Sequence, residues 1–329
     1  MIRLRQLLKL AAIAATAFGL CASPAAWAQS TYPNKTIRLI VPFPPGGPTD
    51  IFARYYANGL AKVLNQSVVV DNKAGASGAI GSAEVKRSPP DGYTLLFGTA
   101  SNLALYNLMA TKPQYDFLKD FETVAVVGGS AVVIMANKSA PQTLKALIDM
   151  ARAQPGKLRY GSPGYGTYLH LSMARFLHEA GVNIEHIPYK GSGQAKPALL
   201  GGQVETMVDA LGSALPLHQT GQARILAVAS ARRSPLAPDV PTVDEALGIK
   251  GFEATLWNGV AAPAGTPKAV IDALSAATAK VLKDAGLQEQ LAKLAMESAD
   301  STPASAAEYI KTETRKWKPA IDATGVKIE

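Results

Sequence analysis

A loop rich in proline and glycine, residues 41–50, contains the residue types that point most directly to chemistry. It joins a short apolar strand to a run whose apolar residues recur at helical spacing. Gly46 and Gly47 permit a sharp turn, and Thr49 or Asp50 can cap the helix that follows. Backbone N–H groups at such a helix start have no partner inside the helix and can bind a carboxylate or phosphate. The loop therefore predicts an anion site.

Apolar strand-like runs alternate with helical patterns along the whole chain, without an internal repeat. This alternation is typical of parallel sheets covered by helices, so the predicted fold class is α/β. Strands are expected at residues 37–41, 67–71, 94–98, 125–127, 132–136, 158–161, 185–187, 206–209, 225–230 and 257–261. Helices are expected at residues 50–64, 78–87, 144–153, 167–180, 194–201, 214–221, 267–283, 287–295 and 304–324.

Two places in the chain are candidate crossings between lobes, one near Gly128 and one at residues 251–256. A first lobe of residues 29–128 plus 255–329, with residues 129–254 inserted as a second lobe, would be joined by two extended strands. Such a hinge suits two lobes that close on a ligand. The C-terminal helix, with Trp317 on its apolar face, is expected to pack on the first lobe.

The first 28 residues have the features of a cleaved secretory signal: a basic start, an apolar run and a small-x-small end. We expect cleavage before Gln29 and export to the periplasm. Cys21 follows Leu20 rather than a small residue, so lipid anchoring is the less favoured alternative. Cys21 is also the only cysteine, which excludes a disulfide or a cysteine nucleophile from the mature protein.

Composition argues against several classes of partner. The net charge of +8 falls to +5 once Arg3, Arg5 and Lys9 leave with the signal. The remaining bases form no dense run, which gives little support to nucleic-acid or membrane binding. A mildly basic surface is compatible with small anionic ligands.

Signatures of catalysis and metal binding are missing from the sequence. It contains neither a G-x-S-x-G nucleophile elbow nor an H-E-x-x-H zinc motif, and its four histidines include no i, i+4 pair. The glycine-rich residues 75–81 lack the ending of a phosphate loop. We therefore expect no cofactor, no metal and no enzymatic activity, with a periplasmic hydrolase as the remaining catalytic alternative.

Motifs spread over nearly the whole mature chain resemble the Bug-type substrate-binding proteins of tripartite tricarboxylate transporters. The resemblance begins with Tyr32-Pro33 and the loop at residues 41–50. It continues through residues 71–78, 90–96, 160–162, 166–171 and 188–191, and then through residues 200–204, 239–242 and 262–267. Each motif is weak alone, and their common order makes the resemblance specific.

The resemblance implies a two-lobed periplasmic binding protein of type II-like form, with a ligand cleft between the lobes. A monomeric receptor would capture a small carboxylate there and deliver it to a membrane permease. Dicarboxylates, aromatic acids and amino acids are all compatible ligands. A sensor that presents the ligand to a membrane signalling protein is an alternative, because both roles use the same ligand-driven closure.

Carried onto this sequence, the resemblance places ligand contacts in loops of both lobes. The expected contacts of the first lobe are Pro45, Gly46, Gly47, Thr49, Asp50, Gly98, Thr99 and Ser101. Those of the second lobe are Ser162, Gly166, Thr167, His170, Tyr189, Lys190, Gly191, Ala195 and Asp209, with Trp257 near the return crossing as a weaker candidate.

Each of these positions also has a purely structural interpretation. Thr49, Asp50 and Thr167 can serve only as helix caps, and Thr99 can belong to a plain turn. Asp209 would repel a carboxylate unless it orients a loop.

Overall fold

The computed structural model describes residues 32–329, so the predicted signal at residues 1–28 lies outside the described part. Its helices and strands all belong to one compact unit, Lys35–Glu329. The strands are β1 (Ile37–Val41), β2 (Val68–Asn72), β3 (Thr94–Thr99), β4 (Phe121–Ala136), β5 (Arg159–Ser162), β6 (Glu185–Pro188), β7 (Thr206–Ala210), β8 (Arg224–Val228), β9 (Thr255–Pro263) and β10 (Glu297–Ser298).

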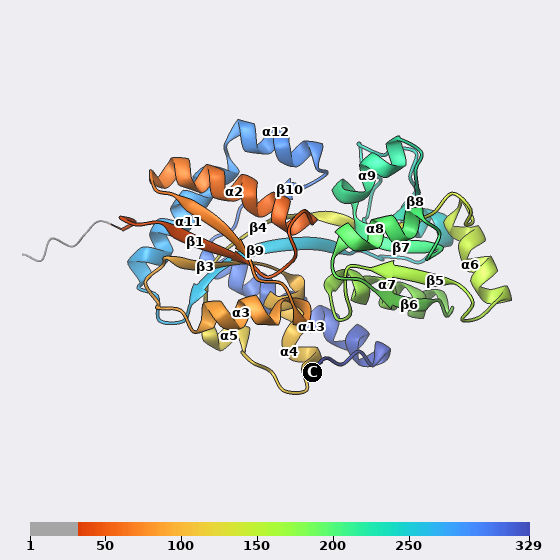
Figure 1. Ribbon diagram of the computed structural model, residues 1–329, viewed down its shortest axis with the longest axis horizontal. Coiled ribbons are helices and arrows are strands. Elements are labelled where there is room, and N and C mark those ends of the chain that lie inside the picture. The colour runs from red at the N-terminus through yellow and green to blue at the C-terminus, as the bar shows by residue number, and fades with distance from the viewer. Residues whose placement is uncertain (1–31) are drawn as a thin grey trace, which may run out of the picture. The chain divides into compact units, whose positions relative to one another are not determined.

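Helices cover the sheet in both halves of this unit (Figure 1). The helices of regular α form are α2 (Pro48–Leu64), α3 (Ala79–Lys86), α4 (Tyr106–Met109), α5 (Phe117–Asp120), α6 (Leu144–Ala153), α7 (Tyr168–Ala180), α8 (Ser192–Leu200), α9 (Leu211–Gln219), α10 (Val243–Leu247), α11 (Lys268–Leu282), α12 (Ala285–Lys293) and α13 (Pro303–Thr324). A 3-10 turn, η1 (Ala76–Gly78), and a π-helical turn, η2 (Ser101–Leu105), complete the list.

The strands follow the order β2-β1-β3-β9-β4-β7-β5-β6, with β8 and β10 also paired to β4. We call the part built on β1, β2 and β3 the first lobe and the part built on β5 to β8 the second lobe. β4 and β9 run side by side between them (Figure 1). Two strands therefore connect the lobes, as predicted, while the boundaries at 128/129 and 254/255 stay predictions.

The expectation of parallel sheets is wrong for the strands that connect the lobes. β1 pairs in parallel with β2 and β3, and β5 with β6 and β7. β4 and β9 are antiparallel to each other, and each is antiparallel to its other main-sheet neighbour. The chain crosses to the second lobe in β4 and returns in β9, so these strands must run in opposite directions.

β4 is one continuous strand, although the sequence predicted two strands on either side of Gly128 and Gly129. These glycines permit close backbone approach instead of breaking the strand. A Cβ atom on Gly128 would lie 2.1 Å from the carbonyl oxygen of Glu297, and one on Gly129 would lie 2.5 Å from that of Leu256. β9 and β10 therefore pack against the crossing point from two directions.

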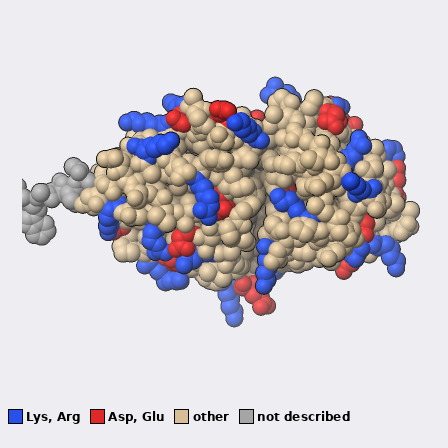
Figure 2. Space-filling model, turned by 45° about the horizontal axis from the view of Figure 1, so that its top comes forward, with Lys and Arg blue, Asp and Glu red and all other residues tan. Residues whose placement is uncertain are grey.

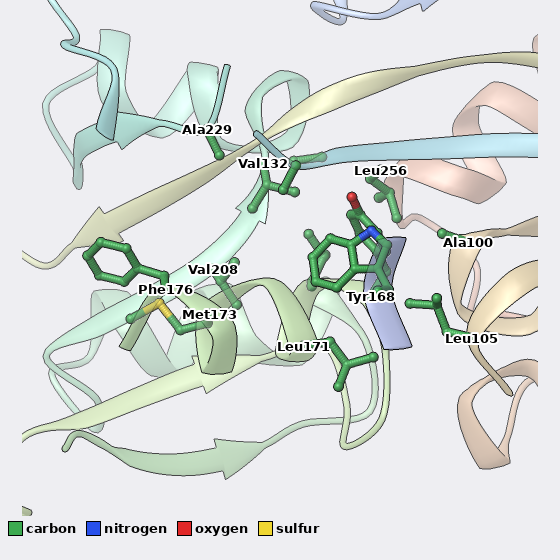
Figure 3. Close-up of a cluster of buried hydrophobic side chains, with 14 of the residues drawn as sticks. Ala100, Leu105, Val132, Tyr168, Leu171, Met173, Phe176, Val208, Ala229 and Leu256 are labelled. Carbon is green, nitrogen blue, oxygen red and sulfur yellow. The ribbon is translucent and has the colours of Figure 1, made fainter. Parts of the chain in front are cut away.

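The core continues across the lobes. Figure 3 shows Tyr168, Leu171, Met173 and Phe176 of α7 in one buried cluster, which Leu105 of the first lobe also joins. The cluster further contains Ala100, Val132, Val208, Ala229 and Leu256.

Helix α13 packs against the first lobe, as the sequence predicted, and also against the second. It contacts β4, η2 and α7. Trp317 is buried, and its ring centroid lies 4.8 Å from that of Tyr168 in α7. Trp257 is likewise a buried core residue, and its indole N–H donates to Glu313 over 3.2 Å.

Gly212, the second residue of α9, lies against the end of α12, where a Cβ atom would be 1.6 Å from the carbonyl oxygen of Leu294. We predict that Gly212→Ala lowers the free energy of unfolding by about 1–3 kcal/mol, because backbone must move to admit the methyl group. Urea denaturation measures this effect.

Gly193→Ala is the matched control, since Gly193 is also the second residue of a nine-residue helix and has no atom within 4 Å of its would-be Cβ. It should leave stability unchanged or slightly higher. Equal losses in the two variants would contradict the close approach at Gly212.

Candidate functional site

A cavity of about 270 Å³ lies between loops of the two lobes. Its first-lobe lining comes from the loop before α2 and from the end of β3, and its second-lobe lining comes from the loops before α7 and α8, with one residue of β9. The lining residues are Phe43, Pro44, Pro45, Gly47, Pro48, Thr49, Thr99, Ser101, Pro163, Thr167, Leu169, Lys190, Gly191, Ser192, Gly193, Gln194 and Leu256.

Three hydroxyl side chains of the first lobe, Thr49, Thr99 and Ser101, are buried and line the cavity. We call them the cavity floor. The Thr99 hydroxyl accepts from the Ser101 N–H over 3.2 Å, and the Ser101 hydroxyl accepts from the Tyr168 N–H over 2.9 Å. Within residues 32–329 no hydrogen bond uses the hydroxyl protons of these three residues as donors. They remain available to a ligand acceptor.

Helix α2 also points its N-terminus at the cavity. Its N-cap is Gly47, with no side-chain cap, so the expectation that Thr49 or Asp50 caps the helix is wrong. The first intrahelical bond runs from the Ile51 N–H to the Gly47 carbonyl over 3.0 Å. The amides of Thr49 and Asp50 precede that bond and add partial positive charge at the floor.

The Asp50 carboxylate holds the loop in place from behind. It accepts from the Gly46 N–H over 2.9 Å, from Arg54 over 3.0 Å and from Asn72 over 2.9 Å. Asn72 also donates to the Phe43 carbonyl over 3.0 Å. Burial alone would raise the pKa of Asp50, but the hydrogen bonds from Arg54, Gly46 and Asn72 outweigh it and lower that pKa. Asp50 is therefore ionised, and its charge is compensated away from the cavity.

A similar arrangement supports helix α8 in the second lobe. Gly191, at φ +93°, is its N-cap, and a Cβ there would lie 3.1 Å from Pro44 of the first lobe. The fully buried Asp209 accepts from Ser192 over 3.0 Å and from Ser213 over 2.8 Å. Burial raises the pKa of Asp209, although nearby Lys196 opposes the shift. Asp209 thus positions the start of α8.

The loop before α7 is fixed by two histidines. Thr167 caps α7 by accepting from the His170 N–H over 3.3 Å. His170 Nδ1 in turn accepts from the Gly166 N–H over 3.1 Å, and the Ser162 hydroxyl lies 2.7 Å from His186 Nε2. The two imidazoles stack at 4.0 Å between ring centroids.

Both histidines are neutral at neutral pH. Burial, with a smaller contribution from His186, lowers the pKa of His170 to about 3. Burial lowers the pKa of His186 to about 4. Ser162 is fully buried and outside the cavity lining, so the Ser162–His186 pair holds a loop instead of facing a substrate.

The lobes touch on several sides of the cavity. Ser101 of the first lobe accepts from Tyr168 of the second, and the Ser77 hydroxyl donates to the Tyr165 carbonyl over 2.5 Å. Pro44 lies against Gly191. The structure therefore presents the lobes in a closed arrangement.

The predicted site residues divide into two groups. The cavity is lined by Pro45, Gly47, Thr49, Thr99, Ser101, Thr167, Lys190 and Gly191. The structure places Gly46, Asp50, Gly98, Ser162, Gly166, His170, Tyr189, Ala195 and Asp209 outside the lining. Most of the second group hold the lining loops through contacts of the kind just described.

Gly98, a residue of this second group, has a packing role next to the cavity. A Cβ there would lie 2.6 Å from the Leu103 side chain and 2.7 Å from that of Asn102, so the residue permits close packing behind the floor. Sequence reasoning missed Phe43, Pro44 and Leu256, which line the cavity with apolar surface. No local sequence signal indicates Leu256, because β9 is buried almost throughout and shows no alternation.

Charge in the lining is sparse. Lys190 is the one ionised side chain in it, with no acid, arginine or histidine. Figure 2 shows basic and acidic side chains scattered over one face of the molecule, without a continuous basic patch that a nucleic acid would need. Among residues 32–329 no cluster of His, Cys, Asp or Glu could hold a metal ion, and none of the helices there is both long and apolar enough to span a bilayer.

Known proteins resemble this chain over most of its length. The family model described as "Tripartite tricarboxylate transporter family receptor" matches residues 52–326. The chain belongs to this receptor family. Its members include periplasmic binding proteins, and they act as solute-binding receptors.

Three similar proteins illustrate the match. BugT of Bordetella pertussis is 38% identical over 302 residues, which is 91% of this chain and 92% of BugT. An R. palustris protein solved with adipate is 34% identical, with a TM-score of 0.86 over 90% of this chain and 99% of its own. MatC of Rhodopseudomonas palustris, solved with bound malate, is 30% identical, with a TM-score of 0.83 over 88% of this chain and 100% of its own.

The neutral histidines predict a pH dependence of stability. Unfolded histidine has a pKa of about 6.5, so below that pH the unfolded chain binds protons that the folded His170 and His186 do not. The free energy of unfolding should therefore fall as the pH falls from about 6.5 to 5, as denaturation at each pH would measure. In a double variant, His170→Gln with His186→Gln, the free energy of unfolding should depend less on pH. Parallel pH profiles for the variant and the unsubstituted protein would contradict the role of these two histidines in the pH dependence.

Proposed function

We propose that this receptor binds a small carboxylate in the cavity between its lobes, in the periplasm, and delivers it to a tripartite tricarboxylate-type permease. The hydrogen-bond donors of the cavity floor are the main support for this proposal. Thr49, Thr99 and Ser101 offer hydroxyl protons, and the α2 amides add partial positive charge. A carboxylate supplies the acceptors that these groups require.

The composition of the lining supports an anionic ligand. With no acid and one lysine, it offers nothing to repel a carboxylate and little to attract a cation. The volume of about 270 Å³ lies just under the usual range for small-molecule sites, roughly 300–1,000 Å³, which favours a small acid. The adipate and malate in the two R. palustris structures belong to this class.

Ligand-driven closure links binding to delivery. A ligand shifts the equilibrium between open and closed forms only if it binds the closed form more tightly. The floor belongs to the first lobe, while Thr167, Lys190 and Gly191 come from the second. A carboxylate that contacts both sides would stabilise the closed form that a permease can recognise. The predicted signal at residues 1–28 supports the periplasmic location.

Thr49→Val tests the floor with little change of shape. The variant removes a hydroxyl that has no partner among the described residues, so the fold should persist while affinity for adipate falls roughly tenfold or more. Isothermal titration calorimetry on the mature chain measures the change.

Thr123→Val is the matched control, since Thr123 is a half-buried residue of β4 outside the lining. It should bind adipate as the unsubstituted protein does. If Thr49→Val and the unsubstituted protein bind adipate equally well, the Thr49 hydroxyl does not bind the ligand. If no member of a broad panel of carboxylates binds, the proposed function is wrong.

A further inference from the structure

We propose that the ligand of this chain is a dicarboxylate with an unsubstituted hydrocarbon spacer, whose second carboxylate is held at the cavity mouth by Lys190. This inference rests on the proposed function and narrows it. We define the mouth as the exposed part of the lining, Pro45, Lys190, Gly193 and Gln194.

The floor accommodates one end of such a ligand. Its three hydroxyls and the first amides of α2 are buried together, and Thr99 and Ser101 are 1% and 2% exposed. Lys190, in contrast, is an exposed residue of the same lining. A carboxylate at the floor therefore leaves the lysine for a different group of the same ligand.

The mouth has the donors for that second group. Lys190 has no ion pair or side-chain hydrogen bond among residues 32–329, and its backbone N–H donates to the Gln194 side-chain oxygen over 3.3 Å. That bond fixes the Gln194 carboxamide oxygen and leaves its NH₂ group as a donor. The amides of Ser192 and Gly193 precede the first intrahelical bond of α8, which ends at the Gly191 carbonyl.

Outside the floor and the mouth, most side chains of the lining are apolar. They belong to Phe43, Pro44, Pro48, Pro163, Leu169 and Leu256, and the remaining lining residues are Gly47, Thr167, Gly191 and Ser192. The nearby hydroxyls are committed elsewhere, because Ser192 donates to Asp209 and Thr167 donates to the Gly164 carbonyl over 2.7 Å. The protons of these two hydroxyls are therefore unavailable to a ligand, and the apolar side chains offer no partner, so several hydroxyl groups on a ligand spacer would lose water here without enough hydrogen bonds in return, which costs free energy.

Isothermal titration calorimetry with adipate, hexanoate and galactarate tests the second carboxylate and the unsubstituted spacer separately. Hexanoate has the same carbon chain as adipate with one carboxylate, and galactarate has the same chain as adipate with a hydroxyl on each spacer carbon. The mature protein should bind adipate at least tenfold more tightly than either.

Substitution of Lys190 tests the assignment of the second carboxylate. Lys190→Gln should lower the affinity for adipate roughly five- to tenfold and leave the affinity for hexanoate nearly unchanged. Lys190→Glu should lower the affinity for adipate further. Lys157→Gln removes the same charge from an exposed second-lobe residue outside the lining and should change neither affinity. Thermal melts check that each variant is folded.

These titrations distinguish a wrong assignment of the second carboxylate from a wrong proposed function. Equal affinities for adipate and hexanoate, an adipate affinity unchanged by Lys190→Gln, or tighter binding of galactarate would each overturn the inference while leaving a carboxylate receptor. If none of these acids nor any other carboxylate binds, both are overturned.

Discussion

Buried hydrogen-bond donors at the cavity floor are the feature on which the rest of the site depends. Thr99 and Ser101 use their oxygens as acceptors for backbone amides, which leaves their hydroxyl protons available to a ligand in the cavity. Burying a donor without an acceptor costs about 1–3 kcal/mol, and an anion removes that cost. The Ser101 hydroxyl also receives the first amide of α7, so the same side chain joins the ligand site to the contact between the lobes.

Each lobe places a buried aspartate behind the loop that lines the cavity. Asp50 orders the loop before α2 and is compensated by Arg54, while Asp209 orders the start of α8 with Lys196 nearby. Neither carboxylate belongs to the lining; Asp50 fixes the loop through the Gly46 amide, and Asp209 fixes the start of α8 through the Ser192 hydroxyl. β4 and β9 connect the lobes that carry these two loops, and they pack closely at Gly129.

Most of the fold was predictable because its strands and helices have clear apolar periodicity. Helix α6 has the predicted bounds, and β4 differs only because its glycines serve backbone packing instead of a turn. The loop motifs indicated lining residues such as Thr49 and Lys190, whose contact with a ligand stays a prediction. For Asp50 and Asp209 the sequence left ligand contact and structural support as alternatives, since it does not show which groups a carboxylate faces. Leu256 enters the cavity from a distant strand, which only the tertiary fold brings there.

A crystal structure of the mature protein with adipate would show whether a carboxylate binds at the cavity floor. We expect its oxygens to lie about 2.5–3.0 Å from the hydroxyl oxygens of Thr99 and Ser101, directly or with one through a bridging water. Adipate bound elsewhere, or in the cavity with only its hydrocarbon chain against these hydroxyls, would contradict this expectation.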